Sequence, residues 1–415
     1  MRLLFFLMCL HGLSLQAQSF KAGAALRKIT PDPLLPVSGG IGTPKPAQQK
    51  QGDLYIRALV LERGNTRVAI VSVDNLGWPS VLGNKSRALI KGIPPENVLI
   101  GATHTHSGPD AYGFPDASGK AYADLAYLDR CVKDMADAVN EAVRNLKPAT
   151  LKIAVGEAKG KIAYNYYADQ LYDPRCGVIQ AIGQDGKPIA TLVNYAIHPE
   201  IIGSGRGILS PDLCGPLYDR IEAKAGGMAI FINSAQGGMV TADNRREGGK
   251  EANDWAECAR IGELLADEAL RIVADAPVQT SPALYCAMRK VSFPVESEIM
   301  QYIIRNSPLG YEMTNKQVSA QVNLLNIGSA QVLTIPGEAL PNIGFYLKRN
   351  MRTRHPFLFG LTNDAFGYML TKVDFSSFKR YEYISRTSLG EQTAEIYMNE
   401  VLKWISESPE PISLK

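Results

Sequence analysis

Residues 97–106 read NVLIGATHTH, an apolar run that ends abruptly in two histidines. An uninterrupted apolar run of about four to eight residues is typical of a strand buried on both faces of a sheet. The pattern recurs in segments 67–74 (RVAIVSVD), 190–198 (ATLVNYAIH), 228–234 (MAIFINS) and 332–338 (VLTIPGE). We therefore predict five buried strands whose C-terminal ends gather polar side chains at one edge, where ligands bind in open α/β sheets.

Apolar residues outside these runs recur at spacings of three and four, which is the period of an amphipathic helix. This spacing predicts helices over residues 121–146, 254–274 and 391–405. Strands that alternate with helices indicate an α/β or mixed α+β fold, in which helices flank central sheets. The chain carries no internal repeat or low-complexity stretch, so we expect one large domain over residues 18–415.

The composition is that of an ordinary globular protein, with 46% hydrophobic and 20% charged residues among 415. It excludes a disordered, collagen-like or multi-span membrane chain. The 44 Lys and Arg residues nearly balance the 41 Asp and Glu residues, which leaves a net charge of +3. Because nucleic-acid binding needs clustered basic charge, we expect no nucleic-acid partner.

The N-terminus has the pattern of a signal peptide. Met1 and Arg2 precede an apolar run over residues 3–10, and small residues lead to Ala17. We predict that residues 1–17 are removed on export, which leaves a periplasmic or secreted chain without a transmembrane segment. The five remaining cysteines are too widely spaced for a C-x-x-C metal motif, so we expect buried thiols with at most one disulfide. They are Cys131, Cys176, Cys214, Cys258 and Cys286.

Three of the four histidines that follow the signal peptide stand at predicted strand ends: His104, His106 and His198. On an extended segment His104 and His106 would project from the same face, because side chains alternate with period two. Glu338 ends another apolar run, and two histidines with one carboxylate form a common hydrolytic zinc set that leaves a position for water. The alternative is that His106 and His198 are hydrogen-bonded core residues and that Glu338 opens a helix.

Four short motifs follow one another along the chain: ATHTHSGP (102–109), NYAIHP (194–199), PGE (336–338) and TNDAFGY (362–368). Together they resemble the catalytic domain of the neutral/alkaline, non-lysosomal ceramidases. The resemblance runs from about residue 21 to 402 and implies a ceramidase-like domain over residues 18–415, without that family's C-terminal immunoglobulin-like domain. It implies an exported, zinc-dependent amidohydrolase that cleaves an N-acyl amide bond, as in a ceramide-like lipid, to a fatty acid and an amine.

The resemblance also implies roles for individual residues. The implied ligands of Zn²⁺ are His104, His198, Glu338 and Tyr368. In the implied mechanism zinc-bound water attacks the amide carbonyl, and His106 donates to the oxyanion or exchanges a proton with the leaving group. Tyr381 resembles a family tyrosine that stabilises that oxyanion. For both tyrosines the alternative is an ordinary packed aromatic ring.

Residues 236–244, QGGMVTADN, depart from the family's pattern. The family carries Gly-Asp-Val-Ser-Pro-Asn there, and the position of its hydroxyl falls on Thr241, so we expect no serine nucleophile. Gly237 and Gly238 indicate a substrate-binding loop whose backbone N–H groups approach the substrate. Asp74, at the end of a predicted strand, is interpreted either as an acceptor that orients a ligand histidine or as a helix N-cap.

The substrate and even the activity stay open at this point. The family's arginine-bearing substrate segment corresponds to residues 164–167 (YNYY), which offer aromatic rings instead. We expect a small-molecule or lipid amide as partner, and transient contact with a lipid surface is compatible with it. One alternative is the same site acting on a different amide or ester. The other is a non-catalytic secreted binding protein, against which the separated zinc-type ligands argue.

Overall fold

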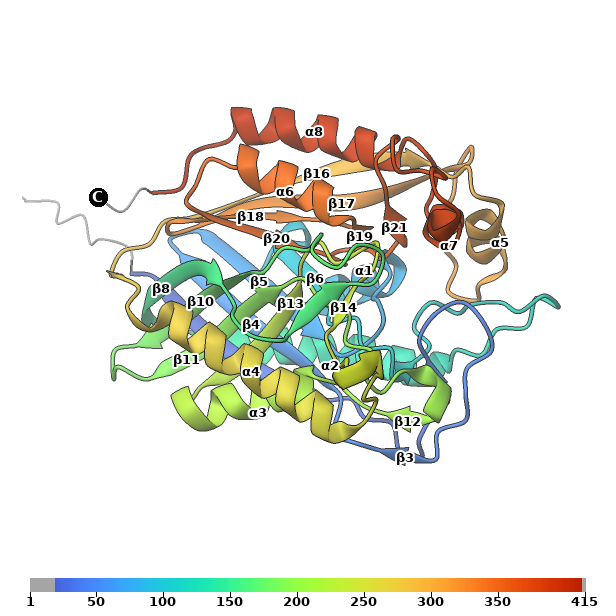
Figure 1. The fold of residues 1–415 in the computed structure, drawn as a ribbon. Helices are drawn as coiled ribbons and strands as arrows, with labels where there is room; N and C mark the ends of the chain where they lie inside the picture. Colours follow the sequence, from blue (N-terminus) through green and yellow to red (C-terminus); the bar gives the residue numbers. More distant parts are fainter. Residues whose placement is uncertain (1–18, 413–415) are drawn as a thin grey trace, which may run out of the picture.

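Two sheets lie face to face in the computed structural model, which describes residues 19–412, and helices cover the outer face of each sheet (Figure 1). Within these residues the larger sheet has nine strands in the order β13-β11-β10-β8-β1-β4-β5-β6, with β15 paired to β8. Their bounds are β1 (Lys21–Lys28), β4 (Tyr55–Arg63), β5 (Thr66–Val73), β6 (Val98–Ala102), β8 (Lys147–Glu157), β10 (Arg175–Gly183), β11 (Pro188–Tyr195), β13 (Met228–Asn233) and β15 (Val278–Gln279).

The smaller sheet follows the order β16-β17-β18-β20. Its strands are β16 (Leu284–Pro294), β17 (Gln317–Ile327), β18 (Ala330–Thr334) and β20 (His355–Phe359). Pairing is parallel for β5–β6, β11–β13 and β18–β20 and antiparallel between the other neighbours of the two sheets. The mixed α+β architecture and all five predicted strands are therefore confirmed.

Helices form the two outer layers (Figure 1). The larger sheet is covered by α1 (Ser80–Leu89), α2 (Leu125–Arg144), α3 (Cys214–Ala225) and α4 (Trp255–Ala274), and the smaller sheet by α6 (Pro341–Asn350) and α8 (Thr393–Glu407). The predicted helices correspond to α2, α4 and α8. Asp124 and Asp254 begin α2 and α4, where each side chain accepts a bond from a first-turn N–H, that of Tyr127 or Glu257.

Short elements complete the structure at the ends of the sheets. Helices α5 (Glu298–Asn306) and α7 (Glu382–Arg386) lie at one end of the molecule (Figure 1). The short strand pairs are β2 (Val37–Ser38) with β7 (Gly108–Pro109), β3 (Gln49–Lys50) with β12 (Ile208–Leu209), β9 (Ala163–Asn165) with β14 (Val240–Ala242), and β19 (Glu338–Ala339) with β21 (Tyr368–Met369). Single 3₁₀ turns are η1 (Pro95–Asn97), η2 (Ser204–Arg206), η3 (Glu247–Gly249) and η4 (Lys379–Tyr381).

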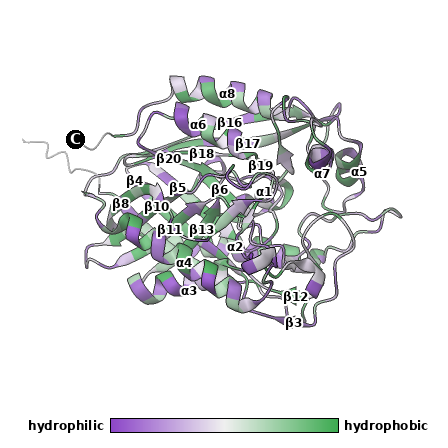
Figure 2. Ribbon diagram, viewed as in Figure 1, coloured by the Kyte–Doolittle hydropathy of each residue, from purple (hydrophilic) through white to green (hydrophobic). Residues whose placement is uncertain are grey.

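Apolar side chains fill the space between the two sheets. Residues of both sheets, including Leu59, Ile70, Ile230, Val332 and Phe357, are buried in one cluster. In Figure 2 the central strands are mostly hydrophobic, whereas α3 and α8 alternate between hydrophilic and hydrophobic residues. Strands with both faces covered have no need of polar alternation, which is why they appear in the sequence as uninterrupted apolar runs.

The two edges of the larger sheet curl toward each other. The Ser72 hydroxyl on β5 donates to the Phe231 carbonyl on β13 at 2.6 Å, although these strands stand near opposite ends of the strand order. The chain after β20 closes the remaining gap, since the Gly360 N–H donates to Asn233 and the Asn363 N–H to Ile100. The C-terminal ends of β5, β6, β11 and β13 therefore meet at one place.

Several predictions concern segments outside the sheets. The predicted signal peptide, residues 1–17, lies outside the described residues. Among residues 19–412, no helix has the length and apolar character needed to cross a bilayer. The five cysteines of this part of the chain are all unpaired; Cys286 is half-buried and the other four are buried, so the predicted thiols are present without a disulfide.

Candidate metal centre

The His104–His106 segment is not the extended strand that we predicted. Strand β6 ends at Ala102, and His104 has a φ of 74°, in the left-handed region. The His104 N–H donates to Asn75 at 2.9 Å and the His106 N–H to Pro199 at 3.0 Å. The two imidazoles nevertheless meet, with their Nε2 atoms 3.3 Å apart. They meet because the backbone turns at His104, not because alternate residues share a strand face.

His198 and Glu338 come from distant segments to the same place. The Glu338 carboxylate lies 3.2 Å from His198 Nε2 and 3.4 Å from His104 Nε2. Glu338 does not open a helix: it belongs to β19, which pairs in parallel with β21 so that Glu338 stands opposite Tyr368. Helix α6 begins only at Pro341. The ligand atoms of His104, His106 and His198 all lie within 4.8 Å of one another.

Hydrogen bonds at Nδ1 orient two of the three imidazoles. His104 Nδ1 lies 2.6 Å from the Leu76 carbonyl, and His198 Nδ1 lies 2.8 Å from the Val240 carbonyl. A carbonyl can only accept, so each Nδ1 carries a proton and each Nε2 is directed at Glu338, where it is the ring nitrogen left to bind a metal. Metal-binding histidines are held in this way. Two oriented nitrogens and one carboxylate oxygen, all buried, therefore fit a zinc ion.

Charge coupling in this cluster is strong. Burial opposes ionisation of Glu338, yet the adjacent His104 and His198 hold the pKa of its carboxyl well below the usual range. Burial also disfavours the charged form of His198, but its hydrogen bond to Glu338 leaves the His198 pKa raised. Burial lowers the pKa of His106 to about 3. His106 is therefore a neutral imidazole at physiological pH in the metal-free chain.

Glu200 is a site residue that our sequence analysis missed. Its carboxylate lies 3.5 Å from His106 Nδ1, and the Thr241 hydroxyl is close to it. Burial raises the pKa of Glu200, but the imidazoles of His106 and His198 together with that hydroxyl bring it below its ordinary value. His106 thus has a carboxylate at Nδ1 where His104 and His198 have carbonyls. The signal was present in the sequence, since Glu200 follows the His-Pro pair of the second motif.

Asn233, the last residue of β13, joins the two histidine-bearing loops and was also missed. Its amide nitrogen donates to Thr103 at 3.1 Å and to Ile197 at 2.7 Å, the residues that precede His104 and His198. Its amide oxygen accepts from the N–H groups of Ile197 and Ser234. The side chain is fully buried and uses both of its donors and both of its acceptors.

A pocket that is partly open to solvent leads to His104, His106 and Glu338. Tyr368 and Tyr383 line it, with their ring centroids 6.0 Å apart, and the Tyr368 hydroxyl lies 3.1 Å from the Met239 sulfur. Much of the remaining wall is apolar. Its members include Ile41, Leu76, Phe114, Met300, Ile303 and Ile304.

Tyr381 is not part of this lining. Its ring packs between Tyr167 and Phe378, at centroid distances of 5.3 and 5.4 Å. The tyrosine that reaches the pocket is Tyr383, two residues later. The predicted position is displaced because Tyr381 ends a 3₁₀ turn and Tyr383 lies in the first turn of α7, so their side chains point in different directions.

The glycine loop lies behind the centre and does not line the pocket. The Gly237 N–H donates to Ala339 at 3.0 Å, so it is not free to approach a substrate as we predicted. A Cβ on Gly237 would lie 2.3 Å from the Glu338 carbonyl oxygen, and one on Gly238 would lie 2.6 Å from Leu340. These glycines therefore permit close packing against β19. Thr241 reaches Glu200 rather than the pocket.

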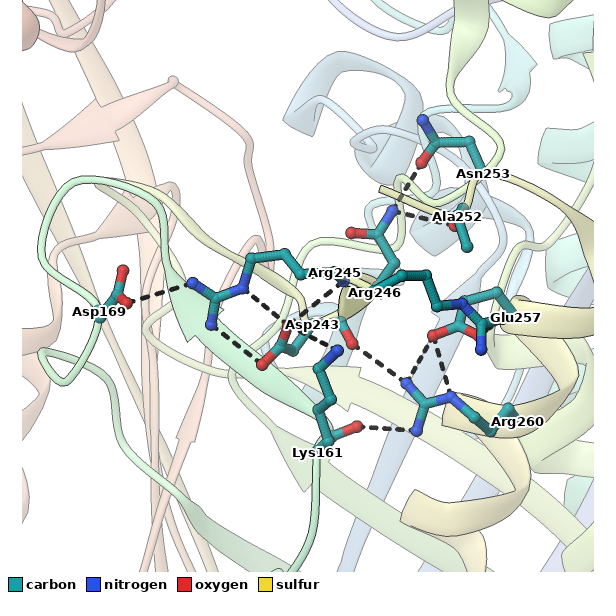
Figure 3. A network of polar contacts seen from close by, with 10 residues as sticks. Lys161, Asp169, Asp243, Arg245, Arg246, Ala252, Asn253, Glu257 and Arg260 are labelled. Carbon is teal, nitrogen blue, oxygen red and sulfur yellow. Dashed lines mark hydrogen bonds and ion pairs between the residues drawn. The ribbon is translucent and has the colours of Figure 1, made fainter. Parts of the chain in front are cut away.

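A polar network holds the chain that follows Thr241 (Figure 3). The Arg245 guanidinium donates twice to Asp243 and also reaches Asp169 at 3.2 Å. The same guanidinium lies 3.6 Å from the Tyr164 ring centroid. An arginine therefore does accompany the aromatic segment 164–167, although it comes from another part of the chain and is engaged by two carboxylates.

Asp74 has neither of the roles that we weighed. Its carboxylate accepts from the Tyr55 N–H at 2.9 Å and from the Tyr218 hydroxyl at 3.1 Å, so it neither touches a ligand histidine nor caps a helix. Burial raises the Asp74 pKa to about 6. The acceptor that orients His104 is instead the Leu76 carbonyl, two residues further along the chain.

Comparison with known proteins agrees with this architecture. No protein-family model and no curated protein sequence matches the chain. A structure titled "Crystal Structure Analysis of neutral ceramidase from Pseudomonas aeruginosa" matches 96% of this chain and 76% of its own, with a TM-score of 0.76 and 17% identity. A second structure, titled "Ceramidase complexed with C2", matches 96% of this chain and 77% of its own, with a TM-score of 0.75 and 18% identity. The sequence resemblance is thus matched by structure: this chain has the fold of neutral ceramidase.

Proposed function

We propose that the protein is a zinc-dependent hydrolase that cleaves the N-acyl amide bond of a ceramide-like lipid. The observation that carries the proposal is the convergence of His104, His198 and Glu338 at an apolar pocket. Because the pocket keeps this cluster accessible to a substrate, it resembles a catalytic zinc site rather than a closed structural one. We further propose that the mature chain acts after export, in the periplasm or outside the cell.

His104, His198 and Glu338 would hold the zinc, and Tyr368 is the proposed fourth ligand because it pairs with Glu338 across β19 and β21. When bound, zinc supplies a Lewis acid that polarises the amide carbonyl and lowers the pKa of water. The carbonyl-bound Nδ1 atoms of the two histidines keep their Nε2 lone pairs aimed at one point.

His106 is the proposed proton carrier. An Nδ1–H directed at Glu200 leaves Nε2 as an acceptor beside the pocket. Nε2 can take the proton that the attacking water gives up, and the imidazolium formed in this way can pass that proton to the departing amine. Because Glu200 is ionised, it stabilises that imidazolium. The Thr241 hydroxyl, close to the Glu200 carboxylate, would have a positioning role instead of a nucleophilic one.

The pocket wall supports an apolar acyl group. Met300, Ile303 and Ile304 of α5 offer aliphatic surface, and Phe114 adds an aromatic face. Tyr383, which lines the pocket, is the proposed donor to the developing oxyanion, in the role that we first predicted for Tyr381.

The test combines metal analysis with hydrolysis of a short-chain fluorescent ceramide, the matching ester and a simple amide. We expect about one zinc per chain and cleavage of the ceramide. His104→Ala should lose both, whereas His355→Ala, which removes an imidazole bonded to Ser329 in the turn between β17 and β18, should keep both. Faster hydrolysis of the ester would redirect the proposal to another acyl substrate. Tight ligand binding without turnover would favour a binding protein.

His106 separates metal binding from proton transfer. His106→Ala should retain zinc and lose about 10²- to 10³-fold in kcat, because a group that acts on developing charge contributes mainly in the transition state. Loss of zinc from His106→Ala together with its retention in His104→Ala would reverse the two assignments.

A further inference from the structure

Large apolar side chains are exposed beside the mouth of the pocket. Val373 is 83% exposed, Phe378 61% and Tyr383 51%, and all three belong to segment 371–386, which leads from β21 through α7. Tyr166, 64% exposed, joins them from the loop after β9. We call these four residues the mouth patch. Contiguous exposed apolar groups on a water-soluble domain usually mark a surface that binds something.

Ring contacts link two members of the mouth patch, Tyr166 and Phe378, through Tyr167 and the buried Tyr381. Tyr166 contacts Tyr167 at a centroid distance of 5.9 Å, and Tyr167 contacts Tyr381 at 5.3 Å, which in turn contacts Phe378 at 5.4 Å. Val373 belongs to the same turn as Phe378, because the Ser377 hydroxyl donates to its carbonyl. Tyr383 is both exposed and part of the pocket lining, so the mouth patch extends to the entrance itself.

Basic side chains surround this apolar surface. Lys372, Lys379 and Arg380 are exposed in the same segment, and among residues 19–412 none of them forms an ion pair with a carboxylate. Of the two acidic residues in the segment, Glu382 pairs with Arg386, whereas Asp374 accepts only from the neutral Asn342 and Thr371 and keeps its charge. The four basic residues of segment 371–386 still outnumber the two acidic ones, so its net charge is positive.

We infer that the mouth patch docks on a lipid bilayer that contains anionic headgroups. Tyr and Phe rings favour the boundary between acyl chains and headgroups, and basic side chains near an anionic bilayer add attraction. Such docking would place the apolar pocket directly over the bilayer, from which a lipid amide could enter without crossing water. That the mouth patch serves to deliver substrate rests on the proposed function, but the binding of the protein to vesicles can be measured without any turnover.

The test is flotation of the purified mature chain with vesicles of phosphatidylcholine, with and without phosphatidylglycerol. Val373→Ser and Phe378→Ser should each weaken binding about tenfold. Lys379→Ser should weaken it about fivefold on vesicles with phosphatidylglycerol and leave it unchanged on phosphatidylcholine alone. Val278→Ser is the matched control, because Val278 is 50% exposed on β15, away from the pocket lining. All four variants should hydrolyse a water-soluble short-chain substrate at the parental rate.

Several outcomes would overturn this inference. Vesicle binding at the parental level by both Val373→Ser and Phe378→Ser would contradict it. An equal loss of vesicle binding in the control Val278→Ser would contradict it as well. Turnover of the soluble substrate by a chain that binds no vesicles would reject the lipid surface and leave the proposed hydrolase intact. Vesicle binding without any turnover would support the surface and reject the hydrolase. Self-association abolished by the same variants, without vesicle binding, would assign the mouth patch to a second copy of the chain.

Discussion

Replacing Asn233 with leucine tests whether the buried amide holds the two metal-binding histidines in register. Leucine has the same branched arrangement of side-chain heavy atoms as asparagine, although it is larger, and it can neither donate nor accept, so Asn233→Leu removes four hydrogen bonds without opening a cavity. At about 1 kcal/mol for each bond, the free energy of unfolding should fall by roughly 3–5 kcal/mol. Both loops that lose their contacts are those that carry His104 and His198.

The distinctive consequence concerns metal affinity. Groups that orient metal ligands typically change metal affinity by about 10- to 100-fold when they are removed. We expect a loss of this size for Asn233→Leu, measured by competition with a chromophoric chelator on protein whose folded state is verified by circular dichroism. Urea denaturation of the metal-free chain supplies the stability change separately.

Asn326→Leu is the matched control. Asn326 is also buried, and it donates to Pro409 at 2.7 Å and accepts from Gln331 at 3.4 Å, away from the metal centre. We expect it to lose about 1–2 kcal/mol of stability and no zinc affinity. Asn233→Leu with parental zinc affinity but reduced stability would refute the reasoning, because the amide would then support only the fold.

Three further predictions test the surroundings of the site. Gly237→Ala should displace β19 and weaken zinc binding about tenfold, because the added Cβ would lie 2.3 Å from a backbone oxygen. Gly205 has open space around it, so Gly205→Ala should bind zinc normally. Equal zinc affinities of the two variants would contradict the packing argument. Glu200→Gln should lower kcat about 10²-fold with zinc content and KM retained, and a parental kcat would exclude a role for Glu200 beside His106. Because burial raises the Asp74 pKa from 3.8 to about 6, the folded state binds this proton more tightly than the unfolded chain, and ionisation costs stability as pH rises through this range. Urea titrations should therefore show Asp74→Asn gaining stability relative to the parent by up to about 3 kcal/mol between about pH 4 and pH 7, and a pH-independent difference would contradict the assigned burial.

Local sequence patterns were sufficient to predict five of the strands, three of the helices and the chemical character of the site, whereas elements such as β1, β8, β17 and α3 were not predicted. Uninterrupted apolar runs identified β5, β6, β11, β13 and β18 because strands covered on both faces are selected for apolar residues throughout. Spacings of three and four identified α2, α4 and α8, because only the buried face of each of these helices is selected for apolar residues. Polar residues at the ends of the runs indicated where a site would form.

What the sequence determined by itself is therefore the identity of the most strongly patterned elements and of three groups able to bind a metal, His104, His198 and Glu338. Which of those groups meet was decided only by the tertiary structure. The sheet curls until β5 and β13 touch, the backbone reverses at His104, and β19 brings Tyr368 opposite Glu338. Periodicity reports which face of an element is buried, but strand order, backbone reversal and the partners of a buried amide depend on contacts between residues far apart in the chain, which no local pattern encodes.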